Sequence, residues 1–435
     1  MARSEPVVDG FVQPDFAEVI PVLRSIIGSY GGGAGVCAYF RGRCVVDLWG
    51  GTKDPSGAPW QRDTMAPSFS TTKGIASTLL HMMVDRGLLR YDDRVAVYWP
   101  EFAQAGKERI TIRQVLSHQS GLYHIRQMID HADRMLDWEH MIAAIERTPP
   151  IHPPGERTGY HGLTYGFLVG EILRRVTGKP FPELVRSELA EPLRLDGMYI
   201  GAPNEALPRT AQLMWPRFGI FGPQLLALEG SLGGTALMQG SRVLGMALRL
   251  FGLQLDLESI IDALAPRGIN AFDFGSPETL RAAIPAANGL FTARSLAKTY
   301  AALANNGELE GVRLLSPKTL GRATRIQDAT AHRLVIPWDM RWRLGYHGVA
   351  TTAGVPRRAF GHFGFGGSGA WADPKRNLSV ALIVNSGFGT PFGDLRILRI
   401  GGAVLTCANR VLARPHPRRT VAMPVRRRVA QAAAG

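Results

Sequence analysis

Ser70 and Lys73, three residues apart, are the residues of this chain best suited to covalent chemistry. They lie in the stretch Ala-Pro-Ser-Phe-Ser-Thr-Thr-Lys-Gly-Ile-Ala-Ser, an S-x-x-K pattern that opens a segment of helical periodicity. On a helix, an offset of three residues places the lysine amine on the same face as the serine hydroxyl, about one turn away. A serine hydroxyl becomes a strong nucleophile when a neighbouring base removes its proton. The pattern therefore predicts a nucleophilic Ser70 with Lys73 as its base.

The predicted helix adds to such a site. Apolar residues recur along it at Ile75, Leu79, Met82 and Met83, and Gly87 ends it. Its N-terminus offers partial positive charge and backbone N–H groups that can face a developing oxyanion. A lysine amine acts as a base near neutral pH only when burial or another cation lowers its pKa. Because S-x-x-K patterns are frequent by chance, the interpretation depends on motifs further along the chain.

Two later motifs accompany the S-x-x-K pattern. Tyr160 begins the sequence Tyr-His-Gly, and His362 begins His-Phe-Gly within the glycine-rich stretch 360–371. In order and approximate spacing, the three motifs resemble the active-site elements of the serine β-lactamase and penicillin-binding-protein superfamily. They are most similar to its class C-like branch, the family VIII carboxylesterases. The resemblance extends over about residues 30 to 400 and includes three supporting stretches, 116–122, 170–178 and 287–292.

The resemblance implies a role for each of the first two motifs. Ser70 would be the nucleophile that forms an acyl-enzyme, and Lys73 its activating amine. Tyr160 would be a second acid/base group that passes protons to the leaving group. A tyrosine does this near neutral pH only if cations lower its pKa from about 10, and Lys73 would be such a neighbour. The resemblance implies no cofactor and no metal ion.

The third motif would line the substrate site. The resemblance places His362 and Gly364 on an edge strand beside the bound acyl group. The backbone N–H of Phe365 would join that of Ser70 in an oxyanion hole. His362 itself could transfer a proton, donate a hydrogen bond or be purely structural.

Two residues depart from the β-lactamase pattern. Gly162 stands where Y-x-N has asparagine, which removes an amide that would bind a β-lactam side chain. His362 stands where K-T-G has lysine, which removes a permanent cation aimed at a substrate carboxylate. Both losses favour neutral substrates, so we expect a serine carboxylesterase or lipase acting on small-molecule or lipid esters. The alternatives are a β-lactamase or D-Ala-D-Ala peptidase, and a non-catalytic, membrane-associated binder of the same fold.

Other polar residues are interpreted as structural. Ser368, in Gly366-Gly-Ser-Gly-Ala370, resembles a G-x-S-x-G nucleophile elbow, but it lacks the last glycine and does not precede a helix. An α/β-hydrolase site is therefore not expected. We expect His118 and His161 to pack near the site or to support its residues.

The segments that must position these residues predict a mixed α/β (α+β) fold. Residues 15–30 are expected to form a helix, and 35–40 and 43–49 a hairpin around Arg41-Gly42. Residues 70–200 are mostly helical in pattern, whereas 360–371 and 378–385 are each expected to form a strand. The continuous apolar run 380–384 is typical of a sheet covered on both faces.

The resemblance implies a serine β-lactamase/DD-peptidase-like fold, with an antiparallel sheet flanked by helices and an inserted, mostly helical domain. We expect an α/β domain from residues 1–62 and 286–412, an inserted domain from 63–285, and a disordered basic tail from 413–435. The apolar, charge-poor stretch Leu213 to Leu255 would be either ordinary core or an acyl-chain wall or lid at the cleft.

Composition restricts the partners. The 435 residues are 45% hydrophobic, enough for a large core, and carry a net charge of +14, half of it from seven arginines in residues 410–435. RNA-binding aromatic motifs are absent, so no nucleic-acid partner is expected. The arginines instead suit peripheral contact with an anionic membrane. Because no secretory signal and no membrane-spanning run is visible, we expect a cytoplasmic or membrane-peripheral protein.

Overall fold

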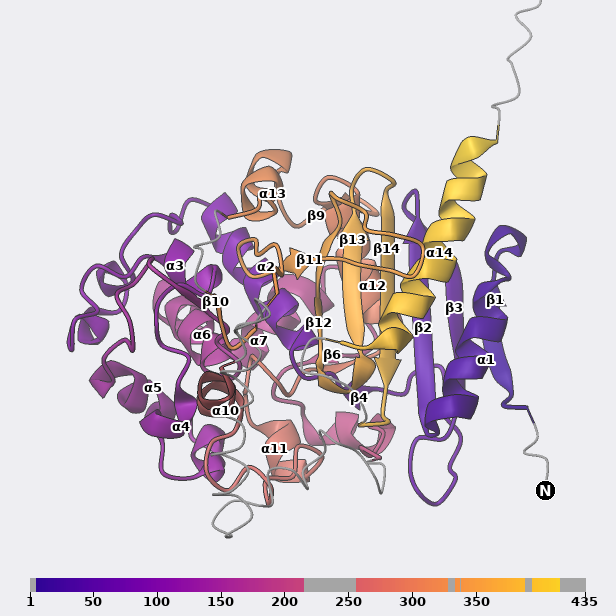
Figure 1. The fold of residues 1–435 in the computed structure, drawn as a ribbon. Helices are drawn as coiled ribbons and strands as arrows, with labels where there is room; N and C mark the ends of the chain where they lie inside the picture. Colours follow the sequence, from indigo (N-terminus) through magenta and orange to yellow (C-terminus); the bar gives the residue numbers. More distant parts are fainter. Residues whose placement is uncertain (1–4, 215–255, 328–332, 337, 388–392, 415–435) are drawn as a thin grey trace, which may run out of the picture.

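The computed structural model describes residues 5–214, 256–327, 333–336, 338–387 and 393–414. Its central element is a seven-stranded antiparallel sheet with the order β1-β3-β2-β14-β13-β12-β11 (Figure 1). The strands are Val8–Val12 (β1), Gly33–Phe40 (β2), Arg43–Gly51 (β3), His347–Gly348 (β11), Phe360–Phe363 (β12), Gly369–Asp373 (β13) and Leu378–Val384 (β14). The sheet therefore combines strands from both ends of the chain, and the predicted mixed α/β fold is confirmed.

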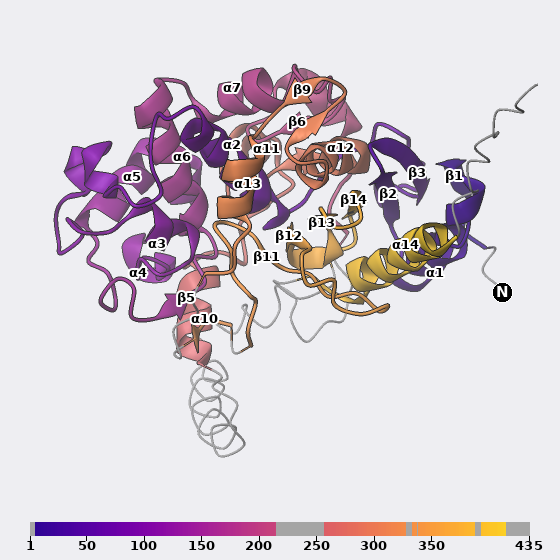
Figure 2. The same ribbon diagram turned by 90° about the horizontal axis from the view of Figure 1, so that it is seen from above.

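Helices cover both faces of this sheet (Figure 2). Ala293–Ala304 (α12) packs on one face, whereas Val19–Tyr30 (α1) and Leu395–Ala413 (α14) pack together on the other. Every residue of β14 is buried, as its continuous apolar run predicts. The Ile383 side chain packs in the apolar cluster that contains α12. Its neighbour Leu382 packs in the apolar cluster that contains α1 and α14. Since a slip by one residue would exchange the two sets of side chains, this burial sets the register of β14.

The chain between β3 and α12 is mostly helical. Its α-helices are Thr71–Asp85 (α2), Ile112–Leu116 (α3), Ile125–Met128 (α4), Trp138–Arg147 (α5), Thr164–Thr177 (α6), Phe181–Val185 (α7), Leu257–Leu264 (α10) and Pro277–Arg281 (α11). The helix α2, which carries the S-x-x-K pattern, contacts both α6 and β12, and its residues 71–84 are all buried. It therefore joins the sheet to the helical region. The domain boundaries near residues 62 and 286 stay a prediction.

Short elements complete the described fold. A three-stranded sheet has the order Ala66–Pro67 (β4), Leu290–Phe291 (β7) and Met198–Tyr199 (β6). Two further sheets have two strands each. One pairs Thr158–Gly159 (β5) with Arg333–Leu334 (β10), and the other pairs Glu308–Leu309 (β8) with Val312–Arg313 (β9). The helix Pro317–Ala323 (α13) follows β9. The strand β4 leads into α2, and its pairing with β7 ties the start of α2 to the segment that follows residue 286.

One predicted strand is wrong. Residues 360–371, expected to form a single strand, form the hairpin of β12 and β13 around a turn at 364–368. Gly366 and Gly367 in this turn have φ of 81° and 96°, left-handed values that glycine adopts without steric cost. Ser368 is buried in the same turn, where its hydroxyl accepts a hydrogen bond from the Val384 N–H at 3.1 Å. This contact supports the structural interpretation of Ser368.

The elements β1 and α14 are among those that the sequence patterns do not anticipate. The helix α14 continues to Ala413, one residue into the predicted tail, and Arg414 forms an ion pair with Asp15 at 2.7 Å. Residues 415–435, and all but the first two residues of the apolar stretch 213–255, lie outside the described residues, so their roles stay predictions. In the described part of the chain, no helix has the length and apolar character needed to cross a bilayer.

Candidate active site

The nucleophile predicted from the sequence lies at the start of α2. Ser70 is the N-cap of this helix and is partly exposed, whereas Lys73 and Tyr160 are buried. Lys73 Nζ and the Tyr160 hydroxyl each lie 2.9 Å from Ser70 Oγ. The structure therefore brings the three predicted residues together at distances that allow proton transfer.

Two backbone carbonyl groups orient the Lys73 amine. Nζ donates to Gly162 O at 2.6 Å and to Ala286 O at 2.9 Å, and the side chain is fully buried. Burial lowers the pKa of Lys73 well below its usual value, because a buried ammonium loses its hydration. A neutral amine has two N–H groups and one lone pair. In the neutral form, both N–H groups would lie on the carbonyls and the lone pair would face Ser70 Oγ, 2.9 Å away.

Tyr160 is held as a neutral phenol. Its buried ring stacks on Trp342, with ring centres 5.6 Å apart, and packs against His118 at 5.0 Å. Burial raises the pKa of Tyr160 above its usual value. The expectation that Lys73 lowers this pKa is therefore wrong, because a neutral amine supplies no positive charge to stabilise a phenolate. In the neutral form, the Tyr160 O–H donates to Ser70 Oγ.

The imidazole of His161 fixes the loop that carries Tyr160 and Gly162. Its Nδ1–H donates to Gly159 O at 2.7 Å, while Nε2 accepts from the Ser120 hydroxyl at 2.6 Å and from a backbone N–H at 3.3 Å. Burial lowers the pKa of His161 to about 3, so the ring is neutral at physiological pH. The expected supporting position of His161 near the site is confirmed.

The third motif ends beside Ser70. A Cβ atom at Gly364, the residue after β12, would lie 2.2 Å from Ser68 O, so a glycine is needed for this close approach. The following residue, Phe365, packs its ring against Phe69, with ring centres 5.5 Å apart. Because Phe69 precedes Ser70 directly, this contact holds the predicted oxyanion-hole residue next to the nucleophile.

His362 is a neutral residue within the protein interior. Its Nδ1–H donates to Phe363 O at 2.9 Å, and the Phe363 N–H donates in turn to His347 Nε2 at 2.9 Å. Burial lowers the pKa of His362 well below its usual value. The third motif therefore supplies no cation to the site, unlike the lysine of K-T-G.

The position of the Y-x-N asparagine is filled by another part of the chain. A Cβ atom at Gly162 would lie 2.3 Å from the Leu264 side chain and 2.6 Å from Ala263 O, both on α10. The glycine thus permits α10 to pack over the loop that carries Tyr160. An asparagine side chain has no room here, which adds a steric reason to the chemical departure seen in the sequence.

Several groups of the site are not apparent from sequence motifs. The carbonyl groups of Gly162 and Ala286 act through the backbone, so their residue types give no signal. Trp342 and His347 lie outside the three motifs, and only their folding onto Tyr160 and β12 shows their involvement. The stretch 287–292, which resembles the superfamily, begins one residue after Ala286 and is the sequence feature closest to this carbonyl group.

Comparisons with known proteins agree with this geometry. The sequence profile of the family described as Beta-lactamase matches residues 23–404, most of the chain. The chain belongs to the β-lactamase family. This β-lactamase-family hydrolase is 37% identical over 388 residues to the esterase/beta-lactamase LipL of Mycobacterium tuberculosis. The alignment covers 87% of this chain and 83% of LipL.

Two solved structures resemble this β-lactamase-family chain closely. A penicillin-binding protein homologue from Caulobacter crescentus matches with a TM-score of 0.75 and 34% identity, covering 92% of this chain and 100% of that chain. A family VIII carboxylesterase matches with a TM-score of 0.76 and 31% identity at the same coverage. The resemblance to the superfamily, and to its family VIII branch, is therefore confirmed.

Burial of Lys73 predicts a pH-dependent contribution to stability. Because its pKa is lower in the folded protein than in the unfolded chain, unfolding takes up a proton between the two values, and stability rises with pH. Lys73→Met removes this titration. In urea unfolding between about pH 7 and pH 9.5, we expect the wild-type free energy of unfolding to rise relative to that of Lys73→Met, by up to about 1.4 kcal/mol per pH unit.

The matched control is Lys179→Met, which removes a lysine whose side chain is 40% exposed. Its free energy of unfolding should follow that of wild type across the same pH range. A wild-type advantage over Lys73→Met that stays constant with pH would show that Lys73 is protonated in the folded state.

Gly162→Asn should not create a β-lactamase. The new side chain collides with Leu264 and Ala263 on α10, so we expect a loss of about 1–3 kcal/mol in unfolding free energy, with no gain in cephalosporin turnover. Adding Leu264→Ala, which empties part of the occupied space, should recover some of that loss. A fully stable Gly162→Asn protein with increased β-lactam turnover would refute the steric argument.

Proposed function

We propose that this protein is a serine carboxylesterase or lipase that works through an acyl-enzyme on Ser70. The observation that carries the proposal is the environment of Ser70 Oγ, with a buried amine and a buried phenol each 2.9 Å away. The amine of Lys73 accepts a proton, and the phenol of Tyr160 donates one. Similarity to LipL, named esterase/beta-lactamase, and to a family VIII carboxylesterase supports an ester as the substrate.

Acylation follows from these positions. Ser70 Oγ attacks the carbonyl carbon of the ester while its proton passes to the lone pair of Lys73. The carbonyl oxygen becomes an oxyanion, which the backbone N–H groups of Ser70 and Phe365 stabilise. As the bond to the alcohol oxygen breaks, Tyr160 gives that oxygen its proton, and the Lys73 ammonium restores the proton of Tyr160. The alcohol leaves, and the acyl group stays bonded to Ser70.

Deacylation uses the same groups with water as the nucleophile. Lys73 takes one proton from water as the water oxygen attacks the acyl carbon, and the oxyanion forms in the same place. The bond to Ser70 Oγ then breaks, and Oγ receives a proton from Tyr160, which Lys73 again restores. The carboxylic acid leaves, and every group returns to its starting protonation state.

The described surroundings of Ser70 favour uncharged substrates. Phe69 contacts both Phe365 and Phe274, with ring centres 5.5 and 5.3 Å apart, which makes an apolar surface beside the nucleophile. His362 is neutral. A penicillin or peptide carboxylate placed against these groups would lose its hydration without gaining a cation from the third motif, which is unfavourable. Neutral esters carry no such cost.

Loss of the nucleophile should abolish ester turnover. We expect Ser70→Ala to lower kcat/KM for a short-chain aryl ester by at least about a thousandfold, and Ser70→Ala with Lys73→Ala to lose little more, because the two residues act as one unit. Ser368→Ala, a loss of the other candidate serine, should retain turnover if it folds, as thermal unfolding will show. An active Ser70→Ala protein would contradict the assignment, and an inactive wild type across an ester chain-length series would favour the non-catalytic alternative.

Esters should be strongly preferred over β-lactams. Since no cation of the third motif meets a substrate carboxylate, we expect kcat/KM for a short-chain ester to exceed that for a chromogenic cephalosporin by at least about a hundredfold. Equal kcat/KM values for the two substrate classes in wild type would favour the β-lactamase alternative.

A further inference from the structure

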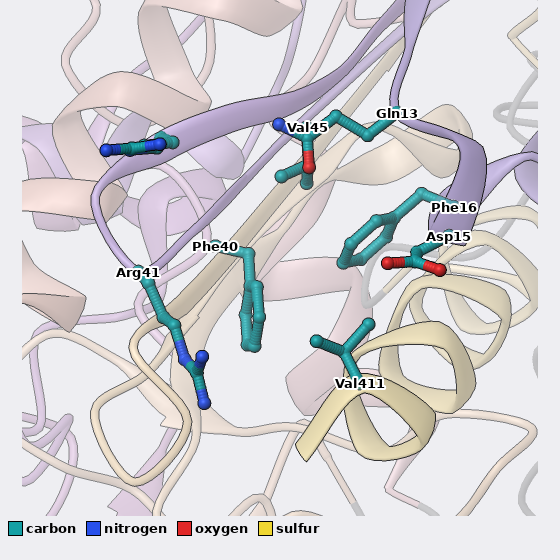
Figure 3. Close-up of a pocket in the computed structure, with 8 residues that line it drawn as sticks. Gln13, Asp15, Phe16, Phe40, Arg41, Val45 and Val411 are labelled. Atoms are coloured by element: carbon teal, nitrogen blue, oxygen red, sulfur yellow. The ribbon is translucent and has the colours of Figure 1, made fainter. Parts of the chain in front are cut away.

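A pocket lies between the β2–β3 turn and the end of α14 and shares no residue with the site around Ser70 (Figure 3). Its volume is about 450 Å³, within the usual range of small-molecule sites. Four apolar residues form much of its lining: Phe16, Phe40, Val45 and Val411. Figure 3 shows the Phe40 ring in the middle of the pocket, with Arg41 on one side and Phe16 and Val411 on the other.

The rim of this pocket carries uncompensated positive charge. Arg41 and Arg43 line it and are exposed, and the Arg41 guanidinium lies 5.1 Å from the centre of the Phe40 ring. Within the described residues, neither arginine forms an ion pair. The acidic residue of the lining, Asp15, is already paired with Arg414 at 2.7 Å. An apolar floor with two free cations suits a ligand that is anionic at one end and apolar at the other.

The sequence that follows Arg414 extends this charge. Five more arginines and no acidic residue occur in residues 415–435, namely Arg418, Arg419, Arg426, Arg427 and Arg428. Like charges repel, so this basic segment is a poor occupant for a pocket with Arg41 and Arg43 at its rim. The rim and the segment are instead attracted by the same anionic surface.

We propose that the pocket is a docking site for an anionic phospholipid of a membrane surface. The headgroup phosphate pairs with Arg41 and Arg43, and the first part of an acyl chain contacts Phe40 and Val411. Stable peripheral binding needs two signals, and this surface combines basic residues with an apolar insertion site. The inference is independent of the esterase proposal, since none of these residues touches Ser70 or its neighbours.

The test is co-sedimentation of the full chain with vesicles of phosphatidylcholine containing about a quarter phosphatidylglycerol, at low and physiological salt. We expect salt-sensitive binding to these vesicles and much weaker binding to pure phosphatidylcholine. The pair Arg41→Glu and Arg43→Glu should reduce binding at least about tenfold. The control pair Arg90→Glu and Arg194→Glu makes the same charge change in the helical region and should reduce binding less than about threefold.

Two further variants separate the pocket from simple charge attraction. Val411→Asn makes the floor polar and should weaken vesicle binding, whereas Leu412→Asn, next to it but outside the lining, should not. Truncation after Arg414 should leave weaker binding that still depends on Arg41 and Arg43. All variants should keep the thermal unfolding midpoint of wild type, which shows that they are folded and keeps this test separate from the esterase test.

The proposal is overturned by any of three results. The first is no binding of the full chain to anionic vesicles at low salt. The second is an equal loss in the Arg41/Arg43 pair and the control pair, which would assign binding to net charge alone. The third is binding to single-stranded RNA that depends on Arg41 and Arg43 without binding to vesicles, which would assign the surface to a nucleic acid.

Discussion

Burial of the Lys73 amine is the interaction on which the rest of the site depends. Removing an ammonium group from water is costly, so burial lowers the pKa of Lys73, and two backbone carbonyls accept hydrogen bonds from its amine. Those carbonyls belong to Gly162 and Ala286, on segments far apart in sequence. The amine keeps its orientation only while both segments close around α2, so the geometry of the proposed base depends on the whole fold rather than on the S-x-x-K pattern alone.

The groups around Lys73 are neutral for the same reason. Burial raises the pKa of Tyr160 and lowers those of His161 and His362, so phenol and imidazoles serve as hydrogen-bonding groups without charge. A permanent cation in this cluster would face an uncompensated desolvation cost and would lower the basicity of Lys73 further. His362 in place of a lysine is therefore consistent with the electrostatics of the site as well as with a neutral substrate.

The grouping of Ser70, Lys73 and Tyr160 could be predicted from residue types and spacing, because their side chains meet at hydrogen-bonding distance and an offset of three on a helix has one geometric meaning. The direction of the Tyr160 pKa shift could not be predicted, because the sequence shows which residues are present but not which of them are buried. In the fold, the sequence did not distinguish the β12–β13 hairpin from a single strand, because glycines occur both in strands and in tight turns. Gly162 was recognised as a departure, but only the position of α10 shows why a side chain cannot fit.

The central claim is that a neutral Lys73 amine presents its lone pair to Ser70. The most direct test follows the Lys73 side chain by NMR in protein labelled with ¹³C and ¹⁵N at lysine, with Lys73→Met used to assign its signal. The account predicts an unprotonated amine at neutral pH whose pKa lies well below 10.5. A Lys73 signal that is still that of an ammonium at neutral pH would contradict it.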